Sequence, residues 1–311
     1  MLKMVPKDTK INFLGIRKTA LVFSSISIVV ALSLFFMNGL NKGIDFEGGI
    51  LMEVGTKDVA ADISLFRSIM SKMNLGDVAV QTFGTPNDVL IRIERQPGAA
   101  PEQQAAVELV QSKLNEAMED LSYRRTEFVG PKVSGELVEA GFMAVIFAVL
   151  AVLVYIWFRF EWHFGVGAVT ALVHDVLLTI GFFSLTGLEF NLSIIAAILT
   201  IVGYSLNDTV VVFDRIRENL RKYQSMELEE LLNLSLNQTL ARTIMTSVTT
   251  LLALLSLFFF GGEVLRGFTS AMIWGVFVGT YSSVFIASPV LLYLNLDRSH
   301  MQLSEEVEEA P

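Results

Sequence analysis

Long runs of apolar residues dominate the pattern of this 311-residue chain. Six runs reach the roughly 20 residues that an α-helix needs to cross about 30 Å of hydrocarbon. They lie at residues 19–40, 138–158, 164–186, 192–213, 243–261 and 268–294. Hydrophobic residues make up 52% of the chain and charged residues 18%. The sequence therefore predicts an α-helical polytopic membrane protein with six transmembrane helices.

The first run also resembles a secretory signal peptide, because basic residues precede it. Its apolar core is longer than a typical signal core, and no small-x-small cleavage site follows it. We therefore favour an uncleaved anchor, with residues 1–18 as a short cytoplasmic N-terminus.

Lysine and arginine in the short loops predict how the helices are oriented. The loop after the fourth span holds a basic group, Arg215, Arg217, Arg221, Lys222 and Arg242, and residues 1–18 hold five basic side chains. The two short loops on the other side hold only Arg266. We therefore expect both termini, including the tail 295–311, in the cytoplasm. The segment 41–137 is then expected on the outer side of the membrane, which the family resemblance described below identifies as the periplasm.

This outer segment alternates short strand-like and helix-like stretches. Strand formers gather at 49–54, 78–83, 89–93 and 123–129, and helical apolar spacing occurs at 59–73 and 101–119. In the second helix we expect the inward positions to be Ala105, Leu109, Ser112 and Met118. The order β-α-β-β-α-β suggests a small ferredoxin-like α+β domain. We interpret it as an interaction or gating module, since no cluster of histidines or acids suggests catalysis.

An aspartate inside the fourth span is the first candidate for function. A carboxylate at the depth of Asp208 costs roughly 2.5–3.5 kcal/mol on insertion scales. Such residues usually face a bundle interior or a wet cavity, and they often mark ion or proton routes. The adjoining face of this helix must meet protein or water, because lipid would leave its polar groups unpaired. That face comprises Ala196, Thr200, Gly203 and Asn207.

Arg242, at the cytoplasmic start of the fifth span, is a candidate partner for Asp208. Burial favours a protonated acid and a nearby arginine favours the carboxylate, so opposed effects would let Asp208 change its protonation state. Two other interpretations stay open. Arg242 extends to the lipid headgroups, or Asp208 is a structural acid bonded to Asn207 or Tyr204. The apolar stripe at 228–236, before Arg242, predicts a helix on the membrane surface.

The third span adds His174 and Asp175 near the middle of the membrane. Asp175 is the stronger signal because acids are rare at that depth, and His174 is a candidate proton relay. Adjacent helical positions point about 100° apart, so these two need not share a partner. Two membrane aspartates also raise the alternative of an intramembrane aspartyl protease, whose carboxylates share one proton. We disfavour it because Asp175 and Asp208 are expected at different depths and the signatures of that class are absent from the sequence.

Small residues recur at every fourth position of the sixth span. This ridge allows close helix approach, and we interpret it as packing within the chain, with a groove for a partner helix as the alternative. It comprises Gly267, Ala271, Gly275, Gly279, Ser283 and Ala287.

Composition narrows the chemistry. The chain has no cysteine, which excludes disulfides and thiolate metal sites. It has no Walker motif, so we expect no nucleotide hydrolysis. The net charge of −9 says little about partners in a membrane protein. We expect the lipid bilayer as surroundings, no nucleic acid and no cofactor.

Several motifs resemble the SecF family of protein-export membrane subunits. The sequence Gly203–Asn219 resembles the family signature in the fourth span. Gly43–Gly49 resembles its first external motif, which we interpret as a tight turn, and Val129–Leu137 resembles its entry to the second span. The pair His174–Asp175 and the stretch Gln238–Thr243 also fit. The resemblance thus covers nearly the whole chain.

The resemblance implies a six-span half of a SecD–SecF complex, similar in fold to the resistance-nodulation-division transporters. It implies a transport subunit of the bacterial inner membrane, not an enzyme. With SecD, such a subunit uses the proton-motive force to draw preproteins from the SecYEG channel late in export, with YajC as a further expected partner. The alternatives are an independent proton-driven exporter of small molecules or lipids, and a scaffold for SecD with no proton role.

The resemblance also assigns roles to residues. Asp208 matches the family's proton-linked acid in the fourth span, and Arg242 matches its arginine in the fifth. The expected proton relay comprises Asp208, Arg242, Asn207, Asp175 and His174.

Overall fold

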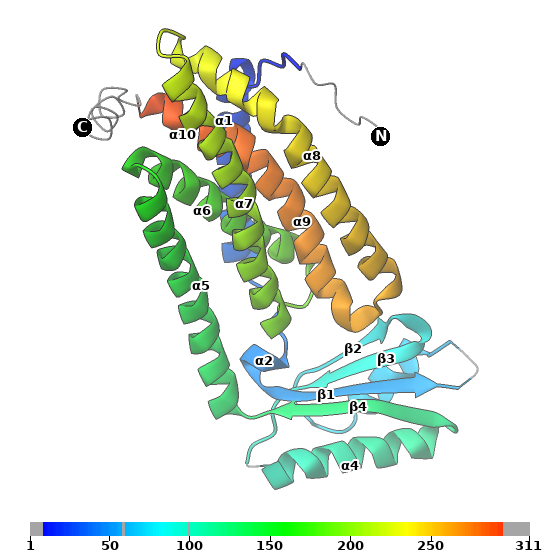
Figure 1. Ribbon diagram of the computed structural model, residues 1–311. Helices are drawn as coiled ribbons and strands as arrows, with labels where there is room; N and C mark the ends of the chain where they lie inside the picture. The colour runs from blue at the N-terminus through cyan, green and yellow to red at the C-terminus, as the bar shows by residue number, and fades with distance from the viewer. Residues whose placement is uncertain (1–8, 58–59, 99, 295–311) are drawn as a thin grey trace.

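The computed structural model describes residues 9–57, 60–98 and 100–294. A bundle of long helices carries a small sheet domain at one end (Figure 1). Within these ranges, six helical segments are long and apolar enough to cross a membrane, which confirms the predicted number. They are α1 (Arg17–Asn38), α5 (Pro131–Arg159), α6 (Trp162–Thr186), α7 (Leu192–Lys222), α8 (Leu228–Phe260), and α9 (Arg266–Ser282) continued by α10 (Ser288–Tyr293). A π-helical turn, η3 (Ser283–Ala287), joins the last two, and short 3-10 turns precede α1 (Leu14–Ile16) and α9 (Glu263–Leu265).

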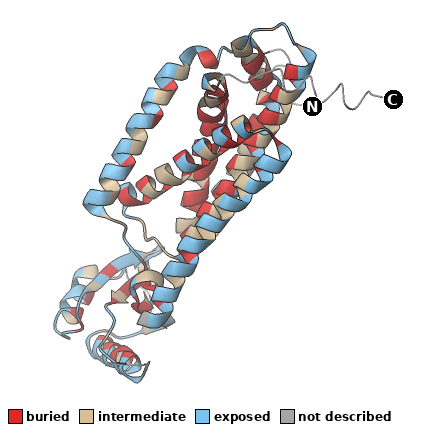
Figure 2. Cartoon of the chain, turned by 90° about the vertical axis from the view of Figure 1, so that its left-hand side faces the viewer, coloured by how far each residue is buried: buried red, intermediate tan, exposed pale blue. Residues whose placement is uncertain are grey.

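The centre of the bundle lies between α7 and α9. Buried positions concentrate in the interior of the bundle (Figure 2). Only 6% of the membrane-spanning part of α5 is buried. The small-residue ridge of α9 packs against α7, as expected within one chain. A Cβ atom added at Gly275 would collide with the Ile201 side chain, and one added at Gly279 would lie 3.0 Å from the Cβ of Ser205. These glycines therefore set how closely the two helices approach.

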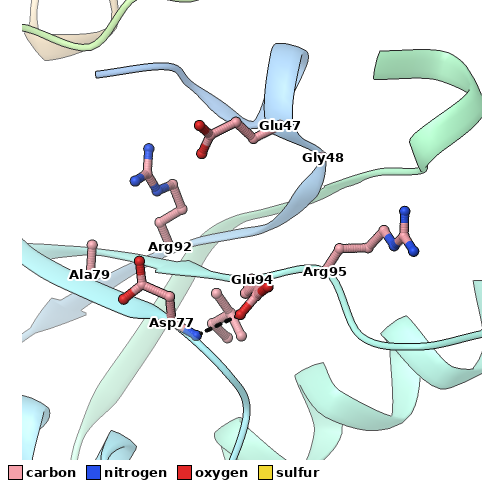
Figure 3. A pocket seen from close by; sticks show the side chains of 8 residues that line it. Glu47, Gly48, Asp77, Ala79, Arg92, Glu94 and Arg95 are labelled. Atoms are coloured by element: carbon pink, nitrogen blue, oxygen red, sulfur yellow. Dashed lines mark hydrogen bonds between the residues drawn. The ribbon is translucent and has the colours of Figure 1, made fainter. Parts of the chain in front are cut away.

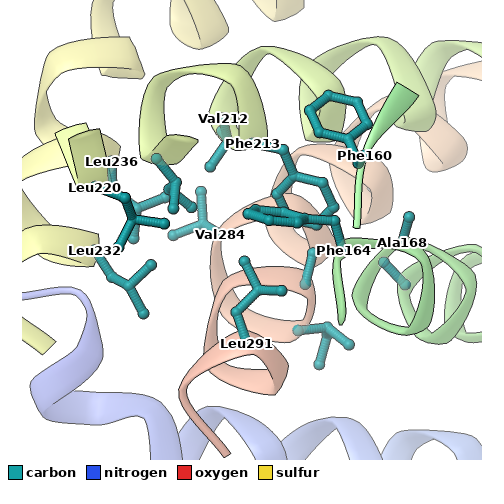
Figure 4. Close-up of a cluster of buried hydrophobic side chains, with 14 of the residues drawn as sticks. Phe160, Phe164, Ala168, Val212, Phe213, Leu220, Leu232, Leu236, Val284 and Leu291 are labelled. Carbon is teal, nitrogen blue, oxygen red and sulfur yellow. The ribbon is translucent and has the colours of Figure 1, made fainter. Parts of the chain in front are cut away.

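A hydrophobic cluster binds the helices together at the end of the bundle that lies away from the sheet (Figure 4). Phe213 of α7 meets Phe160 and Phe164 edge-on, with ring centroids 6.1 and 5.1 Å apart. Leu232 and Leu236, from the first turns of α8, pack into the same cluster.

The predicted surface helix at 228–236 was therefore wrong. Helix α8 runs unbroken from Leu228 to Phe260, and its first turns bury their apolar stripe against protein. Asn219 of α7 secures these turns, because its Nδ2 donates to Ser235 Oγ and Gln238 Oε1 at 2.8 Å each. An amphipathic stripe has the same pattern whether lipid or protein covers it.

The outer domain is an antiparallel sheet with strand order β2-β3-β1-β4. Its strands are β1 (Gly49–Thr56), β2 (Val78–Phe83), β3 (Thr85–Ile93) and β4 (Leu121–Val129), with helices α3 (Ile63–Met70) and α4 (Ala100–Ala117). Helix α4 lies on the far side of the sheet from the membrane helices (Figure 1). The order β1-α3-β2-β3-α4-β4 agrees with the sequence-based expectation, and the ferredoxin-like assignment stays a prediction.

The two faces of the sheet have different partners. Ile50, Met52 and Val54 of β1 pack in one core with α3 and α4, while Leu51 between them packs on the opposite face. Of the inward positions expected here, Met118 packs against this core, but Ala105, Leu109 and Ser112 are exposed. The buried positions of α4 are instead Val107, Val110 and Leu114. Apolar residues occur on several sides of this helix, so its spacing alone does not decide which side faces the sheet.

The segment between α1 and β1 touches both parts of the protein. It contains one helical turn, α2 (Ile44–Glu47), followed by Gly48 at φ +74° and Gly49 at φ +120°. Lys42 forms a parallel bridge with Phe190 in the loop between α6 and α7. Glu189, in the same loop, is partly buried beside this segment.

Glu189 makes the stability of this region depend on pH. Burial raises the pKa of Glu189 above its ordinary value of 4.5; Arg92, Arg125 and a hydrogen bond with Asn191 act against the shift, and Asp45 adds to it. The folded state therefore favours the protonated acid. The contribution of Glu189 to the free energy of unfolding is fully present below pH 4.5, and it is lost as the pH rises through the pKa of Glu189 in the folded state.

As the pH rises above 4.5, we expect the unfolding temperature of Glu189→Gln to fall less steeply than that of the wild type. Thermal unfolding of the detergent-solubilised protein across that range measures the effect. Glu116→Gln, at an exposed acid on α4, serves as the control and should keep the wild-type profile. Parallel profiles for wild type and Glu189→Gln would contradict the assignment.

Candidate functional site

Asp208 lies on α7, where α8 and the π-helical turn meet it, and is 8% exposed. Its Oδ1 accepts a hydrogen bond from Thr243 Oγ1 of α8 at 2.5 Å, and its Oδ2 accepts one from Ser283 Oγ at 2.6 Å. The carboxylate is thus shielded from lipid and connects three segments of the bundle. Neither Asn207 nor Tyr204, the alternatives considered from the sequence, is its hydrogen-bond partner.

Ser283 was not identified as a site residue from the sequence. It fits the small-residue ridge, where a serine is easily interpreted as a packing residue. In the structure it opens the π-helical turn η3. Such turns are rare and occur often at functional sites. The available signal was the consecutive pair Ser282–Ser283 within an apolar span that must pack against an acid-bearing helix.

Asp175 on α6 is fully buried and accepts three hydrogen bonds from side chains. Its Oδ2 accepts from Ser205 Oγ at 2.5 Å and from Ser282 Oγ at 2.8 Å, and its Oδ1 lies 2.9 Å from His174 Nδ1. His174 and Asp175 therefore bond to each other, although adjacent positions of a helix point about 100° apart. The His174 ring also stacks on Tyr281, with centroids 6.0 Å apart.

The two acids bind consecutive residues of the last membrane helix. Ser282 binds Asp175 and the next residue, Ser283, binds Asp208. The two acids therefore reach the same turn of the last helix, whereas the sequence-based expectation had placed them at different depths. Each carboxylate is bound by its own hydroxyl groups, and no hydrogen bond joins the two acids in the described chain. This differs from the shared-proton dyad that an aspartyl protease requires.

Arg242 and Asn207 lie beside the site but not in its hydrogen-bond network. Arg242 directly precedes Thr243, and its charge acts on Asp208 through a Coulombic attraction. Within the described residues, no hydrogen bond or ion pair joins Arg242 to Asp208. Both Arg242 and Asn207 are exposed, on a face of α7 and α8 that no described residue of the chain covers.

The hydroxyl groups suit a carboxylate that gains and loses a proton. A serine or threonine hydroxyl can donate or accept a hydrogen bond, so Thr243 and Ser283 can bind Asp208 in either state. Among the described residues, no group of three or more histidines and acids is placed to hold a metal ion. The site thus consists of a buried carboxylate and two hydroxyl groups from neighbouring helical segments.

We expect Asp175→Ala to destabilise the bundle by about 3 kcal/mol or more, because it removes an acceptor that binds buried groups on three helices. Thermal unfolding in detergent measures the loss. Ser184→Ala is the matched control, since Ser184 lies buried on the same helix and its Oγ lacks a partner in the described part of the chain. A transition temperature for Asp175→Ala equal to that of Ser184→Ala would contradict this role.

Comparison with known proteins places the chain in a family. The family model for the C-terminal region of protein export membrane protein SecD/SecF matches residues 109–297, and the SecD/SecF GG motif matches residues 33–58. The protein translocase subunit SecF of Rickettsia rickettsii (strain Sheila Smith) is 46% identical over 293 residues, 93% of this chain and 94% of that protein. The chain belongs to the SecF family. SecF of Rickettsia prowazekii (strain Madrid E) is 45% identical, again over 93% of this chain and 93% of its own length.

Solved SecDF structures share the architecture. The crystal structure of SecDF, a translocon-associated membrane protein from Thermus thermophilus, matches with a TM-score of 0.84 at 35% identity and covers 94% of this chain. A SecDF structure in a super-membrane-facing form matches with a TM-score of 0.67 at 34% identity and covers 99%. This chain spans only 40% and 41% of those longer chains. Membership of the SecF family implies SecD as a partner.

The SecF comparison covers both regions described above. The acids Asp175 and Asp208 and their hydroxyl partners lie within the stretch matched to the SecD/SecF C-terminal region. The α2 segment and its two glycines lie within the matched GG motif. The protein is thus a multi-pass membrane protein with a transport role in its family.

Proposed function

We propose that this chain is a proton-coupled accessory subunit of the Sec translocase. It works with SecD in the bacterial inner membrane and uses the proton-motive force to assist late stages of preprotein export from the SecYEG channel, with YajC as a further partner. The observation that carries the proposal is the position of Asp208, a buried acid bound by hydroxyl groups of α8 and η3 in a SecF-family chain.

Protonation of Asp208 would change its hydrogen bonds to the neighbouring helical segments. As a carboxylate it accepts from both Thr243 and Ser283. As an acid it has a proton to donate, so one of these hydroxyls must turn to accept it. Because the two hydroxyls belong to different helical segments, the change alters the contacts among α7, α8 and η3. One charge crossing the membrane supplies about 2.3 kcal/mol per 100 mV, enough to bias such an equilibrium.

The uncovered face beside Asp208 supports a partner at membrane depth. Lipid against Asn207 and Arg242 would leave an amide and a guanidinium unpaired in hydrocarbon. We infer that SecD covers this face and contributes the rest of the proton path. In this scheme Asp208, Arg242 and Asn207 form the part of the relay nearest SecD, and Asp175 with His174 forms its inner part.

The placement of the ends supports the proposed orientation. Helix α1 begins and α10 ends at the same end of the bundle, opposite the sheet domain (Figure 1). This arrangement fits cytoplasmic termini and a periplasmic location of the domain 41–137.

The direct test is preprotein export in membrane vesicles that contain SecYEG, SecD and this chain, with and without an uncoupler. We expect export to be stimulated by the chain only while the proton gradient is present. If the chain stimulates export equally with and without the uncoupler, the result would favour a scaffold for SecD with no proton role. Activity of the chain without SecD, as a stand-alone oligomer, would favour the independent exporter.

A further inference from the structure

The outer end of α7 is capped by a residue from a distant part of the chain. Its own N-cap residue, Asn191, makes no side-chain capping bond. Instead, Asp45 Oδ2 accepts a hydrogen bond from the backbone N–H of Leu192 at 2.8 Å, across 147 residues of sequence. The first N–H groups of a helix have no partner within the helix, and a carboxylate is a favoured acceptor for them.

Backbone contacts join the same two segments. Gly43 N–H donates to the Phe190 carbonyl at 2.9 Å, and Phe190 N–H donates to the Asn41 carbonyl at 2.7 Å. The Asn41 side chain donates to the Gly187 carbonyl at 2.9 Å. The α1–β1 segment is thus bound to the whole loop that leads into α7.

The other side of this segment is held by the sheet. Arg92 Nη1, from β3, donates to the Lys42 carbonyl at 2.5 Å. Figure 3 shows the Arg92 side chain extending from the sheet toward the turn that carries Glu47. Ile44 of α2 is buried with Leu51 and Leu90 on the face of the sheet opposite α3 and α4. The segment is therefore fixed between the sheet and the membrane helices.

A close approach at Gly43 confirms how tightly the parts fit. A Cβ added there would lie 2.5 Å from Glu189 Oε1 and 3.1 Å from the Asn191 Cβ. A side chain at this position would require Glu189 and Asn191 to shift.

We propose that residues Asn41–Gly48 form a rigid joint that makes the outer domain and α7 move as one body, with Asp45 as the positioning residue that caps α7. This role goes beyond proton coupling and does not require it. If the proposed function also holds, the joint links the outer domain to Asp208, about 24 Å along α7 from Leu192 at 1.5 Å per residue.

The joint can be tested by a distance measurement on the full-length chain in lipid nanodiscs. The chain has no cysteine, so spin labels attach only at introduced sites. Ala105→Cys on α4 and Thr200→Cys on α7 place labels at exposed positions on the two bodies. We expect one narrow distance distribution for the otherwise wild-type chain.

Asp45→Ala should at least double the width of that distribution, and Asp45→Asn, which keeps an acceptor for Leu192 N–H, should restore the narrow one. Asp62→Ala is the matched control, because Asp62 caps α3 within the domain at 2.9 Å from Ser64 N. Equal widths for Asp45→Ala and Asp62→Ala would overturn the proposed joint.

If Asp45→Ala does not fold, Arg92→Ala replaces it. We expect the same broadening of the distance distribution, and an unchanged width would again overturn the proposal. Asp208→Asn should leave this width unchanged, so failure of the joint and failure of proton coupling are distinguishable.

Discussion

Asp208→Asn is expected to remove the gradient-dependent part of preprotein export, with a loss of at least about tenfold in that component. Asparagine has the size of aspartate and keeps one acceptor oxygen for Thr243 or Ser283. The fold and assembly with SecD should therefore persist. The group that binds a proton is gone, so the contacts among α7, α8 and η3 no longer respond to the gradient. Export in vesicles with and without an uncoupler measures the difference.

Asp214→Asn is the matched control for that experiment. It makes the same chemical change on the same helix, six residues further on, at a half-exposed acid that pairs with Arg159 at 2.8 Å. Surface ion pairs contribute little to stability, so export should stay at the wild-type level. Gradient-dependent export that survives in Asp208→Asn, with SecD still bound, would remove the proton-carrier role from Asp208.

Gly49→Ala is expected to destabilise the outer domain by about 3 kcal/mol or more. Gly49 has φ +120°, a backbone region that costs a non-glycine residue about 1–3 kcal/mol. An added Cβ would also lie 2.6 Å from the carbonyl oxygen of Ile93, which belongs to the neighbouring strand and cannot move without breaking the β1–β3 pairing. Thermal unfolding and hydrogen exchange across β1 and β3 measure the loss.

Gly135→Ala provides the comparison for Gly49→Ala. Gly135 lies in α5 with no atom within 4 Å of an added Cβ. Alanine in a helix is favoured over glycine by about 0.5–1 kcal/mol, so this variant should unfold at the same or a slightly higher temperature. Similar destabilisation in both variants would show that the backbone geometry of the GG motif is not the cause.

The pattern of apolar residues predicted the membrane helices because a helix of about 20 apolar residues has few other stable places. The same logic predicted that Asp208 is shielded from lipid, since an unpaired carboxylate in hydrocarbon is too costly. Both expectations depend on whether lipid, protein or water surrounds a segment, and the polarity of its residues indicates this directly. Burial of Asp208 at 8% exposure agrees with them.

The partners of the buried acids were not predictable in the same way. Ser283 and Thr243 reach Asp208 because α8 and η3 cross α7 at that level, and Ser282 reaches Asp175 because the two serines are consecutive on that turn. A serine has the same local pattern whether it packs or donates to an acid. The π-helical turn that aims these hydroxyls also has no simple signature in the sequence.

The sequence by itself determined the class of protein, the number of membrane helices, the order of elements in the outer domain and the presence of acids at membrane depth, because each follows from local burial and periodicity. Only the tertiary structure decided which groups bind those acids, that α8 continues through 228–236, and that Asp45, in the segment between α1 and β1, caps α7. These contacts join residues tens to hundreds of positions apart, and helix crossings, not local propensity, bring them together.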